Sequence, residues 1–494
     1  MSQFRIRPLQ QDHLLRSREL TRRRFLASTG VGVGGVALSQ LLSSEQRGLV
    51  AGESKNPLTP KPAMIPAKAK RIIYLDMAGA PPQHELFDYK PLLNKYHLQP
   101  CPDELLKGQR FPFIKGHPKL LGCPHKFAQH GQSGAWVSEL LPNLATMVDD
   151  LAFIRSMHTD QFNHAPAELF IFTGSPRFGG ASLGSWITYG LGSENQDLPG
   201  YVVLISGGTD PTGGKSLWGS GFLPSVFQGA QCRSSGDPIL YVSDPAGMDR
   251  SVRRRSLDAL KSLNEQELAR GGDPETLTRI SQYELAFRMQ MSVPEVMDIS
   301  RETKETQEAY GAVPGQASFA NNCLLARRLL EQGVRYVQLF DWGWDIHGTS
   351  KDNDIVHFLP TKCKQIDQPI TALLKDLKQR GLLEDTLIVW GGEFGRTSMN
   401  EARDGSTFLG RDHHPHCYTI WMAGGGIKPG VVYGETDDLG YFVSKDKFSV
   451  RDLQTTILTL MGLDPYKLNF PHKGLQERLI GPTDEGKLHP GIMA

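Results

Sequence analysis

The stretch IVHFLPTKCKQIDQPITALLKDLKQRGLLEDTLIVWGGEFGRT, residues 355–397, decides the fold. It reads as a long helix, a turn at Gly381 and a buried apolar strand that ends in a glycine-flanked polar turn. The stretch before it, residues 321–348, repeats the same order of helix and strand. Strands that alternate with helices are typical of a mainly parallel sheet covered on both faces. We therefore predict an α/β fold with a doubly wound, mainly parallel sheet flanked by helices.

Other apolar runs extend this pattern along the chain. Further strands are predicted from RIIYLDM, YVVLIS and CYTIWMAG, and a helix followed by a strand from LPNLATMVDDLAFIRSM. Residues 250–310 are charged and helical in pattern, which indicates an excursion from the main sheet. Residues 71–494 are thus expected to form one domain.

The amino-terminal segment carries most of the chain's excess positive charge. Residues 1–26 contain seven arginines against two acidic residues, which leaves 47 basic and 51 acidic residues in the remainder. No basic face is implied, so nucleic acid is not an expected partner.

The same segment resembles a twin-arginine export signal. TRRRFLAS supplies the paired Arg22 and Arg23 and precedes a mildly apolar, glycine-rich run that is short for a membrane span. We expect an export signal over residues 1–45 and a Pro/Lys-rich linker over residues 46–70. The twin-arginine machinery would then be a partner, and the protein would be periplasmic or extracellular; the alternative is a basic amphipathic tail.

Candidate metal ligands follow the ends of three predicted strands. Asp76 closes the strand at residues 71–77, Asp345 and His347 follow the strand at 336–341, and Glu393 follows TLIVWGG. Ligands of such sheets bind beyond the carboxyl ends of the strands. Carboxylates and imidazoles together suit zinc, manganese or iron. The alternatives are a solvated turn for the D-x-H pair and a Glu–Arg ion pair for the glycine-flanked turn.

The loop GRDHHPHCY, residues 410–418, offers further polar side chains. If the segment is extended, His414 and His416 share one face and His413 faces away from them. A loop that enters a strand can hold metal ligands stiffly. The alternative is a surface cluster of histidines, with Asp412 beside it.

Two other segments point to an anion. NHAPAELFIFTG begins polar at Asn163 and becomes an apolar helix, with Pro166 in its first turn. His164 then lies near a helix N-terminus, where backbone amides attract anions, unless it only caps the helix. GGTDPTGGKS departs from the phosphate-loop pattern by one residue, so it predicts a rim loop from which Lys215 reaches an anion.

Three blocks of the sequence resemble one known family. DTLIVWGGEFGRT, GRDHHPHCYTIWMAGGGIKPGVVYGETDD and DLQTTILTLMGLD look like the signature blocks of domain-of-unknown-function family 1501, exported bacterial proteins of the alkaline phosphatase-like superfamily. The resemblance spans roughly residues 71–479. It implies a phosphatase, sulfatase or phosphomutase relative with one or two divalent metal ions, of which zinc, calcium, magnesium and manganese are the candidates.

The resemblance also assigns residues to roles. The metal ligands that it implies are Asp76, Asp345, His347, Glu393 and His416, with His414 as the less favoured choice for the last. His164 occupies the position of the nucleophile, because the register of C-S-P-S-R in sulfatases falls on HAPAE here. Since no Cys or Ser stands there, three readings stay open: a phosphohistidine, direct attack by a water that the metal activates, or binding of an anion without turnover.

The sequence therefore predicts an exported, metal-dependent hydrolase of phosphate or sulfate esters, with a small molecule or a glycan as the esterified alcohol. In this reading His164 is the nucleophile or proton donor, and Arg396 stabilises the equatorial oxygens. The residues expected to touch the substrate are Asn163, Lys215, Asp412 and His413. The alternative function is a catalytically inactive protein of the same fold that binds a metal and an anionic glycan.

Overall fold

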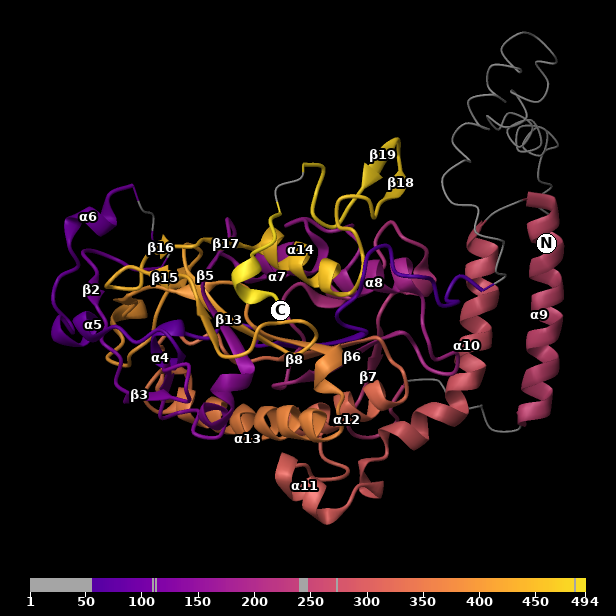
Figure 1. The fold of residues 1–494 in the computed structure, drawn as a ribbon, viewed down its shortest axis with the longest axis horizontal. Helices are drawn as coiled ribbons and strands as arrows, with labels where there is room; N and C mark the ends of the chain where they lie inside the picture. The colour runs from indigo at the N-terminus through magenta and orange to yellow at the C-terminus, as the bar shows by residue number, and fades with distance from the viewer. Residues whose placement is uncertain (1–55, 109–110, 112, 240–247, 272–273, 484–485) are drawn as a thin grey trace, which may run out of the picture. The chain divides into compact units, whose positions relative to one another are not determined.

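A central sheet is built from all the strands predicted above (Figure 1). The computed structural model describes residues 56–494 except 109–110, 112, 240–247, 272–273 and 484–485, so the predicted export signal lies outside the described residues. In spatial order the strands are β14 (Val431–Tyr433), β5 (Leu151–His158), β13 (Tyr418–Ala423), β9 (Thr386–Gly391), β1 (Arg71–Asp76), β8 (Tyr336–Asp341), β6 (Tyr201–Ser206) and β7 (Ala230–Cys232), and β17 (Phe448–Ser449) also pairs with β5.

Strand directions confirm the predicted fold class. β1 pairs in parallel with both β8 and β9, and β6 pairs in parallel with β7 and β8. β13 is antiparallel to both of its neighbours, β5 and β9. The reason is the connection: no helix crosses back over the sheet between β9 and β13, and a chain that returns from the same edge must run antiparallel.

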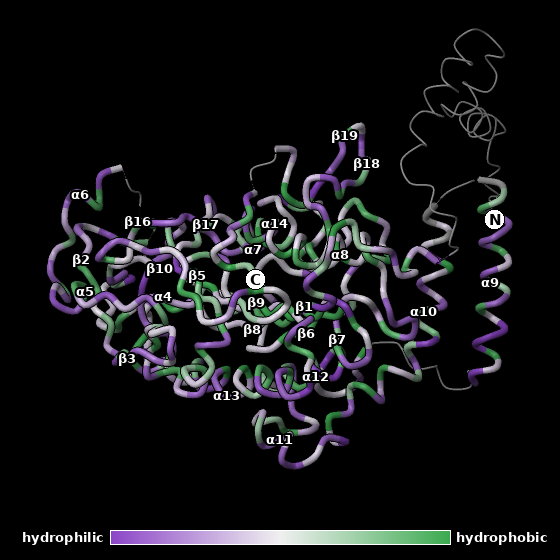
Figure 2. The backbone as a smooth tube through the Cα atoms, in the orientation of Figure 1, coloured by the Kyte–Doolittle hydropathy of each residue, from purple (hydrophilic) through white to green (hydrophobic). Residues whose placement is uncertain are grey.

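Helices cover the two faces of the sheet and separate its core into two parts. Alternate residues of β1 show the division, because Ile73 and Leu75 belong to one apolar cluster, whereas Ile72 and Tyr74 belong to the other. Figure 2 shows the apolar residues gathered along these central strands. The first cluster includes residues of α12 (Phe319–Glu331) and α13 (Phe358–Gln379), and the second includes residues of α7 (His164–Thr173), α8 (Leu183–Leu191) and α14 (Val450–Leu460).

Short elements complete the architecture. The described part of the chain also contains five two-stranded sheets. They pair β2 (Lys119–Leu120) with β11 (Met399–Asn400), β3 (Phe127–His130) with β4 (Ala135–Ser138), β10 (Gly395–Arg396) with β12 (His413–His414), β15 (Glu435–Thr436) with β16 (Val443–Lys445), and β18 (Phe470–His472) with β19 (Leu475–Glu477). The short helices near the amino-terminal end are α4 (Gln83–Leu86), α5 (Pro91–Lys95) and α6 (Asp103–Leu106).

The charged segment forms α9 (Arg250–Gly271) and α10 (Pro274–Met297), which pack against each other, followed by α11 (Lys304–Tyr310). The described part of the predicted linker, residues 56–70, is bound to the domain: the amides of Met64 and Lys68 donate to the carbonyls of Gly462 and Leu460. None of the helices described is both long and apolar enough to span a membrane.

The carboxyl ends of β1, β8 and β9 lie at one edge of the sheet. Asp76 at the end of β1 is in register with Phe340 of β8 and Gly391 of β9. The residues that follow these strands therefore meet in space, although β1 lies hundreds of positions before β8 and β9 in the chain.

Candidate metal centre

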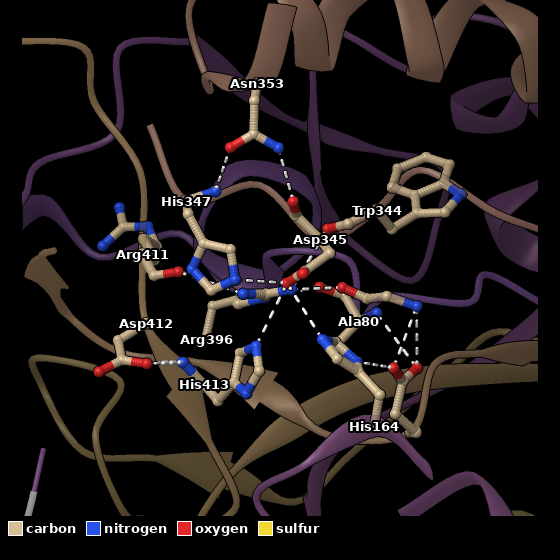
Figure 3. Close-up of polar contacts among 12 residues, drawn as sticks. Ala80, His164, Trp344, Asp345, His347, Asn353, Arg396, Arg411, Asp412 and His413 are labelled. Atoms are coloured by element: carbon tan, nitrogen blue, oxygen red, sulfur yellow. Dashed lines mark hydrogen bonds and ion pairs between the residues drawn. The ribbon is translucent and has the colours of Figure 1, made fainter. Parts of the chain in front are cut away.

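Three histidines converge on a single carboxylate oxygen at this edge (Figure 3). Oδ1 of Asp345 lies 2.7 Å from Nε2 of His347, 3.1 Å from Nε2 of His164 and 3.2 Å from Nε2 of His413. Nη2 of Arg396 donates to the same oxygen at 2.6 Å. The four contacts come from the loop after β8, from α7, from β12 and from β10, so the sheet edge assembles the cluster.

The loop that carries Asp345 is held from two sides. Nζ of Lys362, on α13, donates to Asp341 at the end of β8 at 2.6 Å. Asn353 holds the loop's other end, because its side chain donates to the carbonyl of Asp345 at 2.7 Å and accepts the amide of His347 at 2.9 Å. These bonds fix both D-x-H side chains toward the centre.

Gly79 lets the chain after β1 pass closely against this loop. Its φ is +106°, and a Cβ built there would stand 2.5 Å from the amide nitrogen of Asp345. Only glycine satisfies both the backbone conformation and the close approach. The end of β1 and the Asp345 loop are therefore packed backbone to backbone.

We expect Gly79→Ala to lower the free energy of unfolding by about 3 kcal/mol, because strain at positive φ adds to the clash. Urea unfolding followed by circular dichroism measures the change. Gly179→Ala is the matched control: Gly179 has a φ of +105° but a Cβ there meets no atom within 4 Å. Equal losses in the two variants would show that the contact with the loop contributes nothing.

Each histidine is anchored through its second ring nitrogen. The Nδ1 atoms face Glu393 Oε1 for His164 at 2.5 Å, Glu401 Oε2 for His347, and the carbonyl of Phe162 for His413 at 2.9 Å. Carboxylates and carbonyls only accept, so Nδ1 of His164 and Nδ1 of His413 carry the proton, and their Nε2 atoms face the centre with a lone pair or a second proton. Nδ1 of His347 faces both an acceptor, Glu401, and a donor, Arg403. Histidines that bind a metal are held in this way, with the non-ligating N–H donated to a carboxylate or carbonyl.

Among these acceptors, Glu393 is itself fixed by hydrogen bonds from the backbone. It is fully buried and accepts the backbone amides of Gly79 at 3.0 Å and Ala80 at 3.1 Å as well as Nδ1 of His164. Beside it, the ring of Phe394 packs against the rings of His164 and His413, with centroids 5.0 and 4.7 Å apart. Glu393 thus orients a histidine rather than pointing into the centre itself, and Phe394 supports the two rings.

Charge differs sharply among the cluster's members. Burial alone would lower the pKa of His164, but hydrogen bonds to Asp345 and Glu393 outweigh it and raise the pKa to about 9. Burial lowers the pKa of His413 to about 3, although Asp345 acts in the other direction. Burial would raise the pKa of Asp345, but Arg396 and the three histidines hold it far below its ordinary range. In the absence of a metal, a protonated His164 therefore faces an ionised Asp345.

Two more buried carboxyl groups, those of Asp76 and Glu168, lie close enough to Glu393 to interact with it electrostatically. Asp76 is fully buried, and neither of its carboxylate oxygens has a hydrogen-bond partner. Burial, then Glu393 and Glu168, raise the pKa of Asp76 well above its ordinary value. Glu168, one helical turn after His164, accepts from Thr212 and from the amide of Gly213, and its pKa is raised to about 7, mainly by burial. Glu168 follows His164 by four residues, and this helical spacing would have predicted from the sequence that the two side chains lie on one face of α7.

The histidine loop presents a different residue to the centre from the one expected. β12 pairs with β10 so that His413 lies opposite Arg396, and residues directly opposite in an antiparallel pair share a face. His414 therefore points away, and its Nε2 lies 2.6 Å from the carbonyl of Tyr441. The ring of His416 meets that of His414 edge-on, at a centroid distance of 5.0 Å. The structure thus places His413, and not His416 or His414, at the Asp345 oxygen.

The other residues expected at the site have local roles. Arg396 is 1% exposed and also donates to the carbonyls of Ala80 at 3.0 Å and Arg411 at 3.2 Å. Its N–H groups are thus turned to the protein and not to a substrate.

Asn163 caps α7 by accepting the amide of His164 at 2.9 Å. Asp412 is buried and accepts the amide of His413 at 2.7 Å, and burial raises its pKa to about 6. Lys215 is exposed in η2 (Gly214–Leu217), a short 3-10 helix that follows β6 in the chain. None of the three contacts the Asp345 oxygen in the described structure.

The donor set fits a divalent metal. Among the described residues, His164, Asp345 and His413 place one potential ligand atom each within 4.8 Å of one another, and His347 contacts the same Asp345 oxygen. Three imidazoles with one carboxylate suit zinc or another transition metal. Glu401, which anchors His347, and Arg403, which lies beside it, are further residues that the sequence analysis missed, since nothing in their local pattern marks them.

Comparison with known proteins gives a family. A family model described as "Protein of unknown function (DUF1501)" matches residues 69–490, which confirms the resemblance noted in the sequence. No curated protein matches the chain.

Among solved structures, a sulfatase from Pseudoalteromonas sp. is 12% identical, with a TM-score of 0.35 over 85% of this chain and 73% of that one. A lipoteichoic acid synthase from Listeria monocytogenes is 10% identical, with a TM-score of 0.34 over 86% and 78%. An alkaline phosphatase from the Antarctic bacterium TAB5 is 11% identical, with a TM-score of 0.30 over 80% and 98%. Likenesses this distant do not carry an activity over to this chain.

Proposed function

Since the chain belongs to the DUF1501 family, whose description assigns no function, we propose from its site that it is an exported, metal-dependent hydrolase of phosphate or sulfate esters. One observation carries the proposal. Three histidines, each with its Nδ1 fixed by an acceptor, turn Nε2 toward one carboxylate oxygen. Buried ion pairs add little net stability to a fold. Stability alone therefore does not explain why three imidazoles and a guanidinium are directed at one carboxylate oxygen.

The residues that would hold the metal are His164, His347, His413 and Asp345. A divalent cation there would polarise an ester oxygen and make water a stronger nucleophile at neutral pH. Asp345 is the most accessible of the four, with 27% of its side chain exposed, whereas the histidine side chains are at most 9% exposed. Substrate and water would therefore approach from the Asp345 side, and the histidines and Phe394 would close the centre from behind.

His164 acts in this proposal as a ligand and not as the nucleophile. Both of its ring nitrogens are engaged, Nδ1 by Glu393 and Nε2 by Asp345. Attack by water then needs no covalent intermediate, which agrees with the absence of Ser or Cys at this position. The same observation favours the second candidate function, in which the protein binds a metal and an anionic glycan without turnover.

Export is the remaining part of the proposal. It rests on the paired Arg22 and Arg23 and the apolar run after them. The twin-arginine machinery would be the partner, and the protein would work in the periplasm or outside the cell. Fusing residues 1–45 to a reporter that must fold before export tests this, and replacement of both arginines by lysine should retain the reporter inside the cell.

One experiment tests the activity. The purified protein is analysed for bound metal by mass spectrometry and assayed with 4-nitrophenyl phosphate and 4-nitrophenyl sulfate, with and without a chelator. We expect about one metal per chain and hydrolysis of one of the two esters, lost with the chelator and restored by metal. Stoichiometric metal with no hydrolysis of either ester would favour the binding function, and no metal at all would contradict both.

Metal affinity should depend on pH because His164 must lose its proton to become a ligand. With a pKa of about 9, His164 is protonated at neutral pH, so the metal competes with one proton. We expect the apparent affinity to rise about tenfold per pH unit as the pH approaches 9 from below, and then to level off. Competition with a chromophoric chelator across this range measures it. A flat profile between pH 7 and 9 would exclude His164 as a ligand.

A further inference from the structure

A second arginine lies beside the metal centre, on the side of His347. Nε of Arg403 donates to Oε1 of the buried Glu401, and Nη2 lies 3.0 Å from Nδ1 of His347. The guanidinium also stacks over the ring of Phe113, 4.3 Å from its centroid. With 27% of its side chain exposed, Arg403 is reached by solvent, as Asp345 is.

Arg403 differs from Arg396 in what its N–H groups can still do. The side chain of Arg396 is 1% exposed, and its N–H groups donate to Asp345 and to backbone carbonyls. A substrate oxygen could be bound by Arg396 only if these buried bonds were broken, which is costly. Among the described residues, Nη1 of Arg403 has no hydrogen-bond partner, so its two N–H donors remain in addition to the atoms that face Glu401 and His347.

The position of Arg403 suits an anion bound at the centre. His347 turns Nε2 to Asp345 and Nδ1 to the Arg403 side, so the guanidinium is one imidazole ring away from the point where the histidines converge. Phe113 borders the same place: its ring centroid lies 6.0 Å from that of His347 and 5.9 Å from that of His413. A guanidinium that is held on an aromatic ring by a cation–π interaction keeps its orientation when a ligand arrives.

We propose that Arg403 is the residue that binds the oxygens of a tetrahedral oxyanion, the phosphate or sulfate group of the substrate, with Phe113 as the platform that positions it. The inference rests on the proposed function for its substrate class. It replaces Arg396, to which the sequence assigned this part. Guanidinium groups recognise such anions by charge-assisted, paired hydrogen bonds.

The test uses the metal-loaded full-length protein and inorganic phosphate as the probe, with affinity measured by isothermal titration calorimetry. We expect Arg403→Gln to weaken phosphate binding about tenfold or more, since a hydrogen bond to a charged group is lost. Arg403→Lys should restore part of the affinity because it keeps the charge but not the paired geometry. Arg177→Gln, an exposed arginine beyond the carboxyl end of α7, should bind like the wild type.

Metal content is measured for each variant, because Arg403 also contacts the group that anchors His347. If Arg403→Gln loses the metal, Phe113→Leu decides: it removes the platform without touching His347's acceptor, and we expect phosphate binding about threefold weaker with full metal content. Wild-type phosphate affinity in Arg403→Gln, or in Phe113→Leu where that variant decides, overturns the inference, as does a metal-loaded wild type that binds no phosphate. A protein that hydrolyses no ester but loses phosphate affinity in Arg403→Gln would reject the hydrolase while supporting this role for Arg403.

Discussion

His413→Ala is expected to lose the bound metal and all metal-dependent hydrolysis, whereas His416→Ala, three residues away in the same loop, retains both. His413 turns Nε2 to Asp345, and its Nδ1 is fixed by the carbonyl of Phe162. Removing one of three imidazoles from a zinc-type site costs orders of magnitude in metal affinity. The ring of His416 instead contacts that of His414, whose Nε2 faces the carbonyl of Tyr441, so we expect His416 to contribute no ligand.

The measurement is metal content after dialysis, together with the rise in melting temperature when metal is added. A metal that binds only the folded state stabilises it, so the wild type and His416→Ala should melt higher with metal, and His413→Ala should not. Both variants delete an imidazole from one short loop, that of His413 from a buried position and that of His416 from a half-buried one. If His416→Ala lost the metal and His413→Ala kept it, the centre described above would be assigned to the wrong face of the loop.

The sequence predicted the edge of the sheet that carries the site. Apolar runs marked the strands, and the rule that ligands bind beyond the carboxyl ends placed Asp345, His347 and Glu393 together. This part is predictable because the period of the apolar residues and the alternation of helix and strand are local properties. The same local reasoning correctly grouped His414 with His416 and set His413 apart, as their ring contact shows.

The face of the histidine loop that meets the centre could not be predicted. It depends on β10 pairing with β12, which sets His413 opposite Arg396. A shift of one residue in that pairing would have turned His414 inward instead, because successive side chains of an extended chain point to opposite sides. β10 and β12 are only two residues long each, and the register of such a short pairing leaves no pattern in the sequence.

The roles of the two arginines were hidden for a different reason. Arg396 stands in a conspicuous glycine-flanked turn, which suggested a group that reaches a ligand. The structure shows that buried carbonyls, among them that of Ala80, already take its donors. Arg403 lies in an unremarkable stretch and gains its place only through Glu401 and Phe113. Whether an arginine has donors left over is a property of the folded interior.

Asp345→Asn should be the most damaging single change at the centre. Oδ1 of Asp345 receives Arg396 and faces His164, whose pKa of about 9 makes it a second cation at neutral pH. Without the carboxylate, the buried guanidinium of Arg396 loses its counter-charge, and His164 loses a hydrogen bond that raises its pKa. Removing one partner of a buried ion pair lowers the free energy of unfolding by about 3–5 kcal/mol. Because Asp345 is partly exposed, we expect a loss of about 3 kcal/mol.

Asp345→Asn tests the contribution of the carboxylate to stability and its role as a metal ligand in separate measurements. In the metal-free protein, urea unfolding at pH 7 should show the loss of stability, and the difference from the wild type should shrink above pH 9, because the wild type then loses the attraction between protonated His164 and Asp345. In the metal-loaded protein, binding should be lost because a ligand is missing. Asp352→Asn, in the exposed η5 turn of the same loop (Lys351–Asn353), is the control and should match the wild type in both. A stable Asp345→Asn that still binds metal would show that the convergence of histidines on this oxygen has no energetic role, and the metal centre would have to be sought elsewhere along the edge of the sheet.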